Sequence, residues 1–121
     1  MTLTVLAVDD SRTIRDMLRL ALTEVGIEVH LAEDGVDGLE RLAELEPDAI
    51  ISDINMPRLD GFGFIEAVRL QDRHRATPIL VLTTESAPEL KARARAAGAT
   101  GWIVKPFDPP KLVQALRMVT G

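Results

Sequence analysis

The sequence has 121 residues, a length that suits one domain. Hydrophobic residues make up 46% and charged residues 27%, which is typical of a globular protein rather than a disordered chain. Lys and Arg number 14 against 19 Asp and Glu, and the net charge of -5 argues against general attraction to nucleic acid or to an anionic membrane surface. The absence of cysteine excludes a disulfide scaffold, a thiolate metal site and a cysteine nucleophile.

The start of the chain does not have the pattern of a signal peptide. Its first apolar run, residues 3–8, has no basic residue before it and ends at Asp9 and Asp10. No apolar stretch approaches the ~18 residues of a membrane span. Only 3% of residues are aromatic, which disfavours base stacking on single-stranded nucleic acid. We therefore expect a cytoplasmic protein that binds neither nucleic acid nor membrane.

Apolar runs of strand length alternate five times with helical patterns, which predicts β/α units around a parallel sheet. The first, third and fourth of these strands are almost continuously apolar, as expected when helices cover both faces of a sheet. Glu28 and His30 alternate with apolar residues in the second, which indicates a half-exposed edge strand. The expected strands are residues 4–8, 28–32, 49–52, 79–82 and 101–104.

Each helical pattern begins at a residue that can cap a helix. The residues Ser86 to Glu89 have the form of a capping box for the fourth helix. Met17 and Met118 fall on apolar stripes and are expected in the core, whereas His30 and His74 are expected at the surface. The other expected caps are Ser11 or Asp10, Asp34, Asp60 and Asp108.

Five strands are too few for a closed eight-stranded barrel, so right-handed crossovers predict an open, doubly wound α/β sheet of the flavodoxin-like type, with strand order 2-1-3-4-5. Residues 1–121 are expected to form this one domain. Ligands bind such sheets outside the carboxyl ends of the strands. Four predicted strands end there in polar residues: Asp9 and Asp10, Asp53, Thr83, and Lys105.

Taken singly, these residues have ordinary roles as caps, turn formers or solvated charges. Together, the three carboxylates repel one another by about 1 kcal/mol per pair, and a fold does not require such an arrangement. Hard oxygen ligands without Cys or His favour Mg²⁺. Lys105 and the Thr83 hydroxyl would then hold further oxygens of a phosphoryl group, with a carboxylate as nucleophile.

These residues, together with the Asp60-Gly61 turn and Lys105-Pro106, resemble the receiver domains of two-component response regulators over the whole chain. The resemblance implies that Asp53 accepts a phosphoryl group from a histidine kinase. It also implies a cis Lys105-Pro106 bond and a Thr83 hydroxyl that moves toward the phosphoryl group, with which Lys105 pairs. The implied Mg²⁺ ligands are Asp9, Asp10, Asp53 and the backbone carbonyl of Asn55, and the residues implied to set the phosphate lifetime are Asn55 and Glu85.

The five β/α units use up the chain, so we expect no effector domain. This form resembles the single-domain chemotaxis regulators of the CheY type, which act as switches and not as enzymes on other substrates. The implied partners are a CheA-like histidine kinase or a histidine phosphotransfer protein, and an output protein such as a flagellar motor switch component. The implied output face includes Leu90, Arg93, Ala97, Trp102 and the outer side of residues 111–119. Trp102 stands where receivers more often have Tyr, Phe or His, so the aromatic switch is expected to differ.

Three alternatives use similar elements. A phosphorelay intermediate or phosphate sink would have the same site and would exchange the phosphoryl group with a histidine phosphotransfer protein. A haloacid-dehalogenase-like phosphatase needs an Asp at the position of Asn55, and it needs a cap domain. A flavodoxin-like electron carrier needs a phosphate-binding loop after the first strand, and that segment does not contain one.

Overall fold

The computed structural model describes residues 2–121, and its five parallel strands lie in the order β2-β1-β3-β4-β5, as predicted. The strands are β1 (Thr4–Val8), β2 (Glu28–Ala32), β3 (Ala49–Ser52), β4 (Ile79–Thr83) and β5 (Gly101–Val104). The helices are α1 (Arg12–Glu24), α2 (Gly35–Leu42), α3 (Gly61–Arg69), α4 (Pro88–Ala97) and α5 (Pro109–Thr120).

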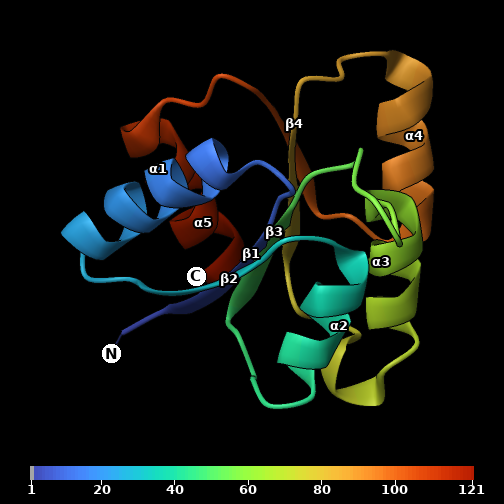
Figure 1. Ribbon diagram of the computed structural model, residues 1–121, viewed down its shortest axis with the longest axis horizontal. Coiled ribbons are helices and arrows are strands. Elements are labelled where there is room, and N and C mark those ends of the chain that lie inside the picture. The colour runs from blue at the N-terminus through green and yellow to red at the C-terminus, as the bar shows by residue number, and fades with distance from the viewer. Residues whose placement is uncertain (1) are drawn as a thin grey trace.

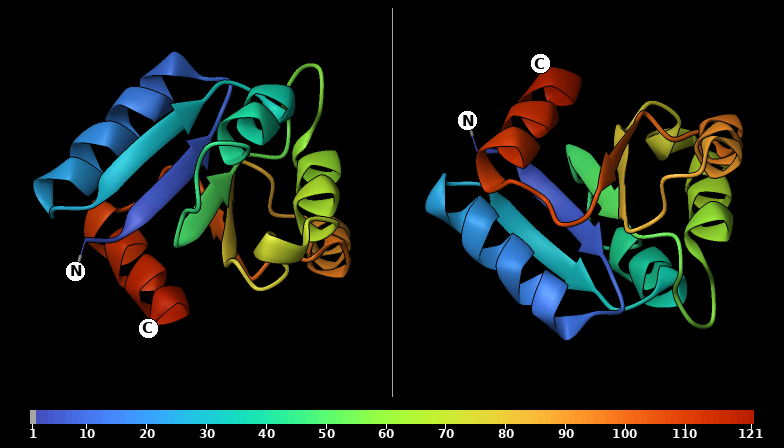
Figure 2. Two further views of the ribbon diagram at one scale, coloured as in Figure 1. Left: turned by 90° about the horizontal axis from the view of Figure 1, so that it is seen from below. Right: turned by 90° about the horizontal axis from the view of Figure 1, so that it is seen from above.

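Helices cover both faces of the sheet. Figure 1 shows α1 and α5 on one side and α2, α3 and α4 on the other, and the views in Figure 2 agree. Alternate β1 side chains enter the two cores: Val5 and Ala7 pack with α1 and α5, and Leu6 and Val8 with the opposite helices. Strand β2 lies at the edge and is partly exposed, as its alternating pattern predicted.

Four helices begin at a side chain that accepts a backbone N–H, as the sequence predicts. The caps are Ser11, Asp34, Asp60 and Asp108. The prediction of a capping box at the start of the fourth helix was wrong. That helix begins at Pro88, so Ala87 occupies the cap position and Ser86 comes one residue too early. Of the ten α4 residues, Ala94 alone is buried, so α4 is attached to the protein by few side chains.

Two methionines expected in the core lie at the surface, because each falls beside the buried stripe of its helix. Met17 is 42% exposed and precedes Leu18, which is fully buried. Met118 is 75% exposed, two positions beyond the buried Leu116. On an amphipathic helix, one step along the chain turns a side chain by about 100°, which is enough to leave the apolar face.

The prediction that His74 lies at the surface was also wrong. It ends a short 3₁₀ turn (Asp72–His74) and is 1% exposed. Its Nδ1 lies 3.2 Å from the Thr77 hydroxyl, and its Nε2 has no hydrogen-bond partner among residues 2–121. Burial lowers the pKa of His74, the positive charges of Arg73 and Arg69 lower it further, and Glu46 opposes them.

We expect His74 to make the fold less stable in mild acid. Because its pKa is lower in the folded than in the unfolded protein, the unfolded chain binds the proton first. Its stability contribution is therefore intact above the unfolded pKa of about 6.5 and is lost as the pH falls below that value. The free energy of unfolding in urea at pH 7.5, 6.0 and 5.0 measures this loss. The free energy of unfolding of the His74→Phe variant should fall less than that of the parent over this pH range. An unchanged pH dependence in the variant would contradict the assignment of this loss to His74.

Candidate functional site

Strand pairing brings the predicted carboxylates together. Val8 pairs with Ser52 in the sheet, so Asp9 and Asp53 follow adjacent strands at the same edge. Backbone bonds continue this register, because the Asp53 N–H donates to the Val8 carbonyl at 3.0 Å. One carboxylate oxygen each from Asp9, Asp10 and Asp53 lies within 4.8 Å of the other two. Asp9 and Asp53 are buried and Asp10 is exposed, so the cluster opens to solvent on the side of Asp10.

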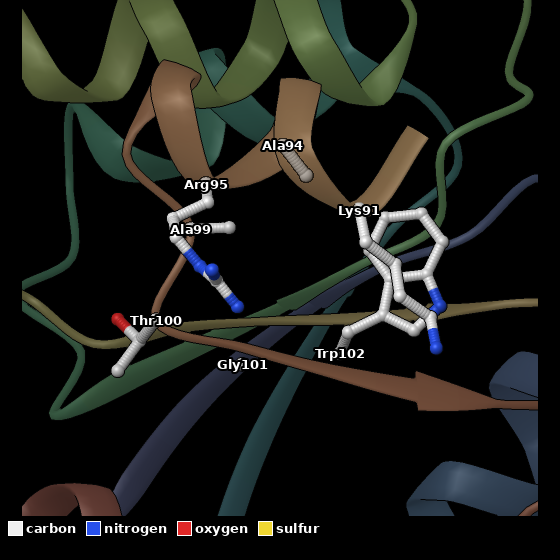
Figure 3. Close-up of a pocket in the computed structure, with 7 residues that line it drawn as sticks. All are labelled: Lys91, Ala94, Arg95, Ala99, Thr100, Gly101 and Trp102. Atoms are coloured by element: carbon white, nitrogen blue, oxygen red, sulfur yellow. The ribbon is translucent and has the colours of Figure 1, made fainter. Parts of the chain in front are cut away.

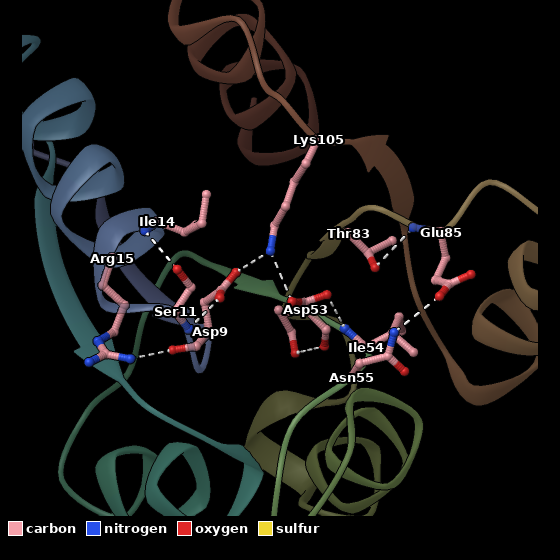
Figure 4. Close-up of polar contacts among 11 residues, drawn as sticks. Asp9, Ser11, Ile14, Arg15, Asp53, Ile54, Asn55, Thr83, Glu85 and Lys105 are labelled. Carbon is pink, nitrogen blue, oxygen red and sulfur yellow. Dashed lines mark hydrogen bonds and ion pairs between the residues drawn. The ribbon is translucent and has the colours of Figure 1, made fainter.

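Lys105 bridges two of these carboxylates (Figure 4). Its backbone N–H donates to the Thr83 carbonyl at 2.7 Å, which continues the pairing of β4 and β5. Its Nζ lies 2.7 Å from Asp9 Oδ2 and 2.9 Å from Asp53 Oδ2. Burial disfavours the ammonium charge, but the hydrogen bonds to Asp9 and Asp53 outweigh it and raise the pKa of Lys105. For Asp9 the balance is opposite: burial raises its pKa more than Lys105 lowers it.

Further contacts hold the two buried aspartates, and the sequence did not indicate them. The Ser11 N–H donates to Asp9 Oδ1 at 2.9 Å, and the Ile54 N–H donates to Asp53 Oδ1 at 2.7 Å. The guanidinium of Arg15 donates to the Asp9 carbonyl at 2.7 Å. The sequence indicated Ser11 only as a helix cap. A backbone N–H donor is present in almost every residue, so the residue type does not show which one binds a carboxylate.

The predicted Thr83, Asn55 and Glu85 lie together beside Asp53 (Figure 4). Thr83 is fully buried, and its Oγ1 accepts the Glu85 N–H at 3.3 Å. The Asn55 side-chain amide donates to Glu85 Oε1 at 3.2 Å. Glu85 therefore connects the loop after β4 to the loop after β3.

Trp102 joins this network through Glu85. Its indole N–H donates to the Glu85 carbonyl at 3.0 Å. The ring packs with the core under α2, α3 and α4, and with Lys91 and Ala94 it lines a small cavity of about 60 Å³ (Figure 3). Trp102 thus lies against α4 and is hydrogen-bonded to the Glu85 backbone.

The site residues fit a divalent cation. Three carboxylates converge and Lys105 supplies one positive charge, so at full ionisation two negative charges remain unbalanced. The side-chain atoms that could coordinate a metal are all carboxylate oxygens, the hard ligand type that Mg²⁺ prefers. The exposed side of the cluster leaves room for water ligands. The Lys105-Pro106 bond beside it is cis, as the resemblance implied.

Residues 5–117 match the response regulator receiver domain family, and the chain belongs to it. Within that family the protein is CheY-like, with relatives in chemotaxis. Chemotaxis protein CheY1 of Helicobacter pylori is 38% identical over 118 residues, which are 96% of this chain and 95% of CheY1. Protein PilG of Pseudomonas aeruginosa is 35% identical over 95% of this chain and 85% of PilG. The chain spans about half the length of other relatives, such as the response regulator MprA of Mycobacterium leprae, which is 41% identical over 114 residues, 93% of this chain and 49% of MprA.

Two solved structures illustrate the likeness. The chemotaxis protein CheY4 of Vibrio cholerae is 49% identical and superposes with a TM-score of 0.95 over 98% of this chain and 99% of CheY4. The receiver domain of the sensor histidine kinase PA1611 from Pseudomonas aeruginosa PAO1 is 26% identical, with a TM-score of 0.92 over 100% of this chain and 99% of that domain. That crystal structure has a magnesium ion coordinated in the active site cleft.

Proposed function

We propose that the protein is a Mg²⁺-dependent signalling switch in which Asp53 accepts a phosphoryl group from a phosphohistidine. The observation that carries this proposal is the bridge of Lys105 Nζ between Asp53 and Asp9, with the Asp10 carboxylate beside them. A lysine held between two carboxylates is placed to neutralise further oxygens that arrive at Asp53.

In the proposed reaction, a carboxylate oxygen of Asp53 forms a bond to phosphorus as the bond from phosphorus to the histidine nitrogen breaks. The imidazole leaves with the electron pair. Lys105 binds a phosphoryl oxygen, and the Thr83 hydroxyl turns from the Glu85 N–H toward another. Asp9, Asp10, Asp53 and the Asn55 carbonyl would hold Mg²⁺, which neutralises negative charge on the transferred group.

Labelling with a small phosphodonor tests the proposal. Incubation with acetyl phosphate and Mg²⁺ should add one phosphoryl group, which mass spectrometry maps to Asp53. The Asp53→Asn variant should not be labelled, and excess EDTA should abolish labelling of the parent protein. Phosphate on Asp9 or Asp10 of the parent protein, or full labelling in EDTA, would reject the assignment.

We propose that Asn55 and Glu85 set the lifetime of the phosphorylated state. Their hydrogen bond joins the two loops beside Asp53, where we expect water to approach the phosphorus. Asn55→Ala and Glu85→Ala should each speed dephosphorylation at least threefold, or ~0.6 kcal/mol in barrier. The decay of labelled protein after removal of the donor gives the rate. Rates within twofold of the parent would show that both residues only solvate the rim.

We also propose that Trp102 reports the phosphorylation state. Movement of the Thr83 hydroxyl toward the phosphoryl group frees the Glu85 N–H, and the Glu85 carbonyl is the acceptor of the indole N–H. Trp102 is the only Trp in a chain without Tyr, so emission reports it alone. Beryllofluoride with Mg²⁺ should shift the emission of the parent protein and leave Asp53→Asn unchanged. Identical spectra in both proteins would assign Trp102 to a fixed packing role.

For partners, we propose a CheA-like histidine kinase or a histidine phosphotransfer protein as donor and a flagellar motor switch component as target, all in the cytoplasm. The similarity to CheY1 and CheY4 supports chemotaxis. The proposed output face lies on α4, β5 and α5, where Arg93 stacks 4.0 Å over the Phe62 ring and Leu90 and Ala97 are partly exposed. Phosphotransfer profiling against the histidine kinases and phosphotransfer proteins of the host tests the donor.

A further inference from the structure

The loop between β3 and α3 carries Asn55 and is attached to the protein on both sides of that residue. At its base, the Gly61 N–H donates to the Ile54 carbonyl at 2.8 Å. At its tip, Arg58 reaches the start of α2, where Nε donates to Asp34 Oδ2 at 2.7 Å and Nη2 donates to Asp34 Oδ1 at 3.0 Å. Asn55 lies between the two attachments, so its backbone geometry depends on both.

The turn at Arg58 has an unfavourable backbone conformation. Arg58 has φ of +65° and is the one non-glycine residue with positive φ in the described part of the chain. The Leu59 N–H donates to the Pro57 carbonyl at 2.7 Å, which closes a three-residue turn around Arg58. Such turns with positive φ are rare and strained, because the Cβ crowds the backbone. The turn therefore needs a restraint from outside the loop.

Asp34 is well placed to provide that restraint. It is 3% exposed, and its Oδ1 also accepts the Asp37 N–H at 2.8 Å as the cap of α2. The hydrogen bonds from Arg58 hold the pKa of Asp34 below its usual range, so the carboxylate is charged at neutral pH. A two-point contact between guanidinium and carboxylate fixes direction as well as distance. The Gly35 N–H, which donates to the Leu59 carbonyl at 3.2 Å, adds a second tie.

We propose that the Arg58–Asp34 pair positions the magnesium site by holding this strained turn and, through it, the Asn55 backbone carbonyl. The inference rests on the proposed function, in which that carbonyl is a Mg²⁺ ligand. Arg58 acts through the loop and has no role as a ligand. Without the pair the turn relaxes and the carbonyl moves, whereas Asp9 and Asp53 stay in place because they follow sheet strands. Loss of an outer partner of a ligand typically lowers metal affinity about 10-fold or more.

Three variants of Arg58 distinguish the restraint that its side chain places on the turn from the effect of its positive charge. Arg58→Ala removes the guanidinium but keeps a Cβ in the strained turn, whereas Arg58→Gly removes both. Isothermal titration with MgCl₂ at pH 7.5 should give a Kd about 10-fold higher for Arg58→Ala and less than threefold higher for Arg58→Gly, because glycine accepts positive φ. Arg58→Lys should fall between, since it can reach only one carboxylate oxygen. Loss of a positive charge near an acidic site would by itself tighten Mg²⁺ binding, so weakening is the opposite of a charge effect.

A second position tests the route through Asp34. Asp34→Asn keeps an acceptor for the Asp37 N–H and removes the charge, so α2 remains capped. It should weaken Mg²⁺ binding in the parent protein and have no further effect in Arg58→Ala. Hydrogen exchange of the Leu59 amide, which the turn protects, should speed up in both single variants. The proposal is overturned if Arg58→Ala binds Mg²⁺ within twofold of the parent, or if Arg58→Ala and Arg58→Gly are equally weakened.

Asp10→Asn distinguishes failure of this inference from failure of the proposed function. If the parent protein does not bind Mg²⁺, or if Asp10→Asn binds it equally well, the proposed metal site is wrong and the inference fails with it. If the parent binds Mg²⁺, Asp10→Asn weakens it and Arg58→Ala does not, the function stands and only the positioning role is rejected. Thermal unfolding of each variant shows that folded proteins are compared.

Discussion

Replacing Lys105 with methionine is expected to slow phosphorylation of Asp53 by about 100-fold or more, because removal of one preorganised donor from such a site typically costs that much. Methionine matches the length of the lysine stem but has no charge. Asp9 and Asp53 would both lose the ammonium that now lies within 3 Å of each. Incoming phosphoryl oxygens would then meet carboxylates whose charge is no longer balanced.

The initial rate of labelling with acetyl phosphate at fixed Mg²⁺ gives this effect directly. Lys111→Met is the matched control, because it removes an exposed lysine from the first turn of α5, away from the carboxylates. Its rate should equal that of the parent. A Lys105→Met rate within threefold of the parent would mean that Lys105 serves only to pair the carboxylates in the resting protein.

Gly61→Ala is expected to destabilise the fold by about 3 kcal/mol and to disturb the site at the same time. A Cβ at this position would lie 2.2 Å from the Asp53 carbonyl oxygen and 2.7 Å from the Ile54 Cα. Both are backbone atoms, so no side-chain rotation relieves the clash. Either α3 or the chain at Asp53 must move, and phosphorylation should slow along with the loss of stability.

Gly26→Ala separates steric clash from backbone strain. Gly26 has φ of +79°, but a Cβ there would have nothing within 4 Å. It should cost only the ~1 kcal/mol of a left-handed alanine and leave labelling unchanged. Urea unfolding and the labelling rate of both variants test the comparison. Equal losses for the two would show that the close approach at Gly61 is relieved at little cost.

The sequence predicts the fold, and it predicts which candidate site residues converge, because both depend on patterns that are local or follow from topology. Strand and helix periodicity is visible in a short window, and side chains that can cap marked four of the five helix starts. Parallel strands place their carboxyl ends at one edge, so Asp9, Asp53 and Lys105 were expected to meet before any distance was known.

What could not be predicted depends on contacts between distant segments. Arg58 and Asp34 are 24 residues apart, and neither residue type indicates that they pair. Arg58 has a positive φ, but a positive φ is usually predicted only where the sequence has glycine. His74 lies in a polar connection, which favoured the surface, whereas it is 1% exposed at the end of the 3₁₀ turn that precedes β4. Trp102 could be assigned to the face toward α4 from strand alternation, but its bond to the Glu85 carbonyl could not.

The weak attachment of α4 has a consequence for how this protein can evolve. Helix α3 buries five of its residues, whereas α4 buries Ala94 alone. Substitutions of exposed residues away from caps and cores usually change stability by less than ~0.5 kcal/mol. Most exposed residues of α4 can therefore be substituted with little loss of stability. The carboxylates and Lys105 lie at the end of the sheet and do not depend on those side chains. Mutations on α4 can thus create contacts to new partners while the proposed phosphoryl chemistry stays unchanged.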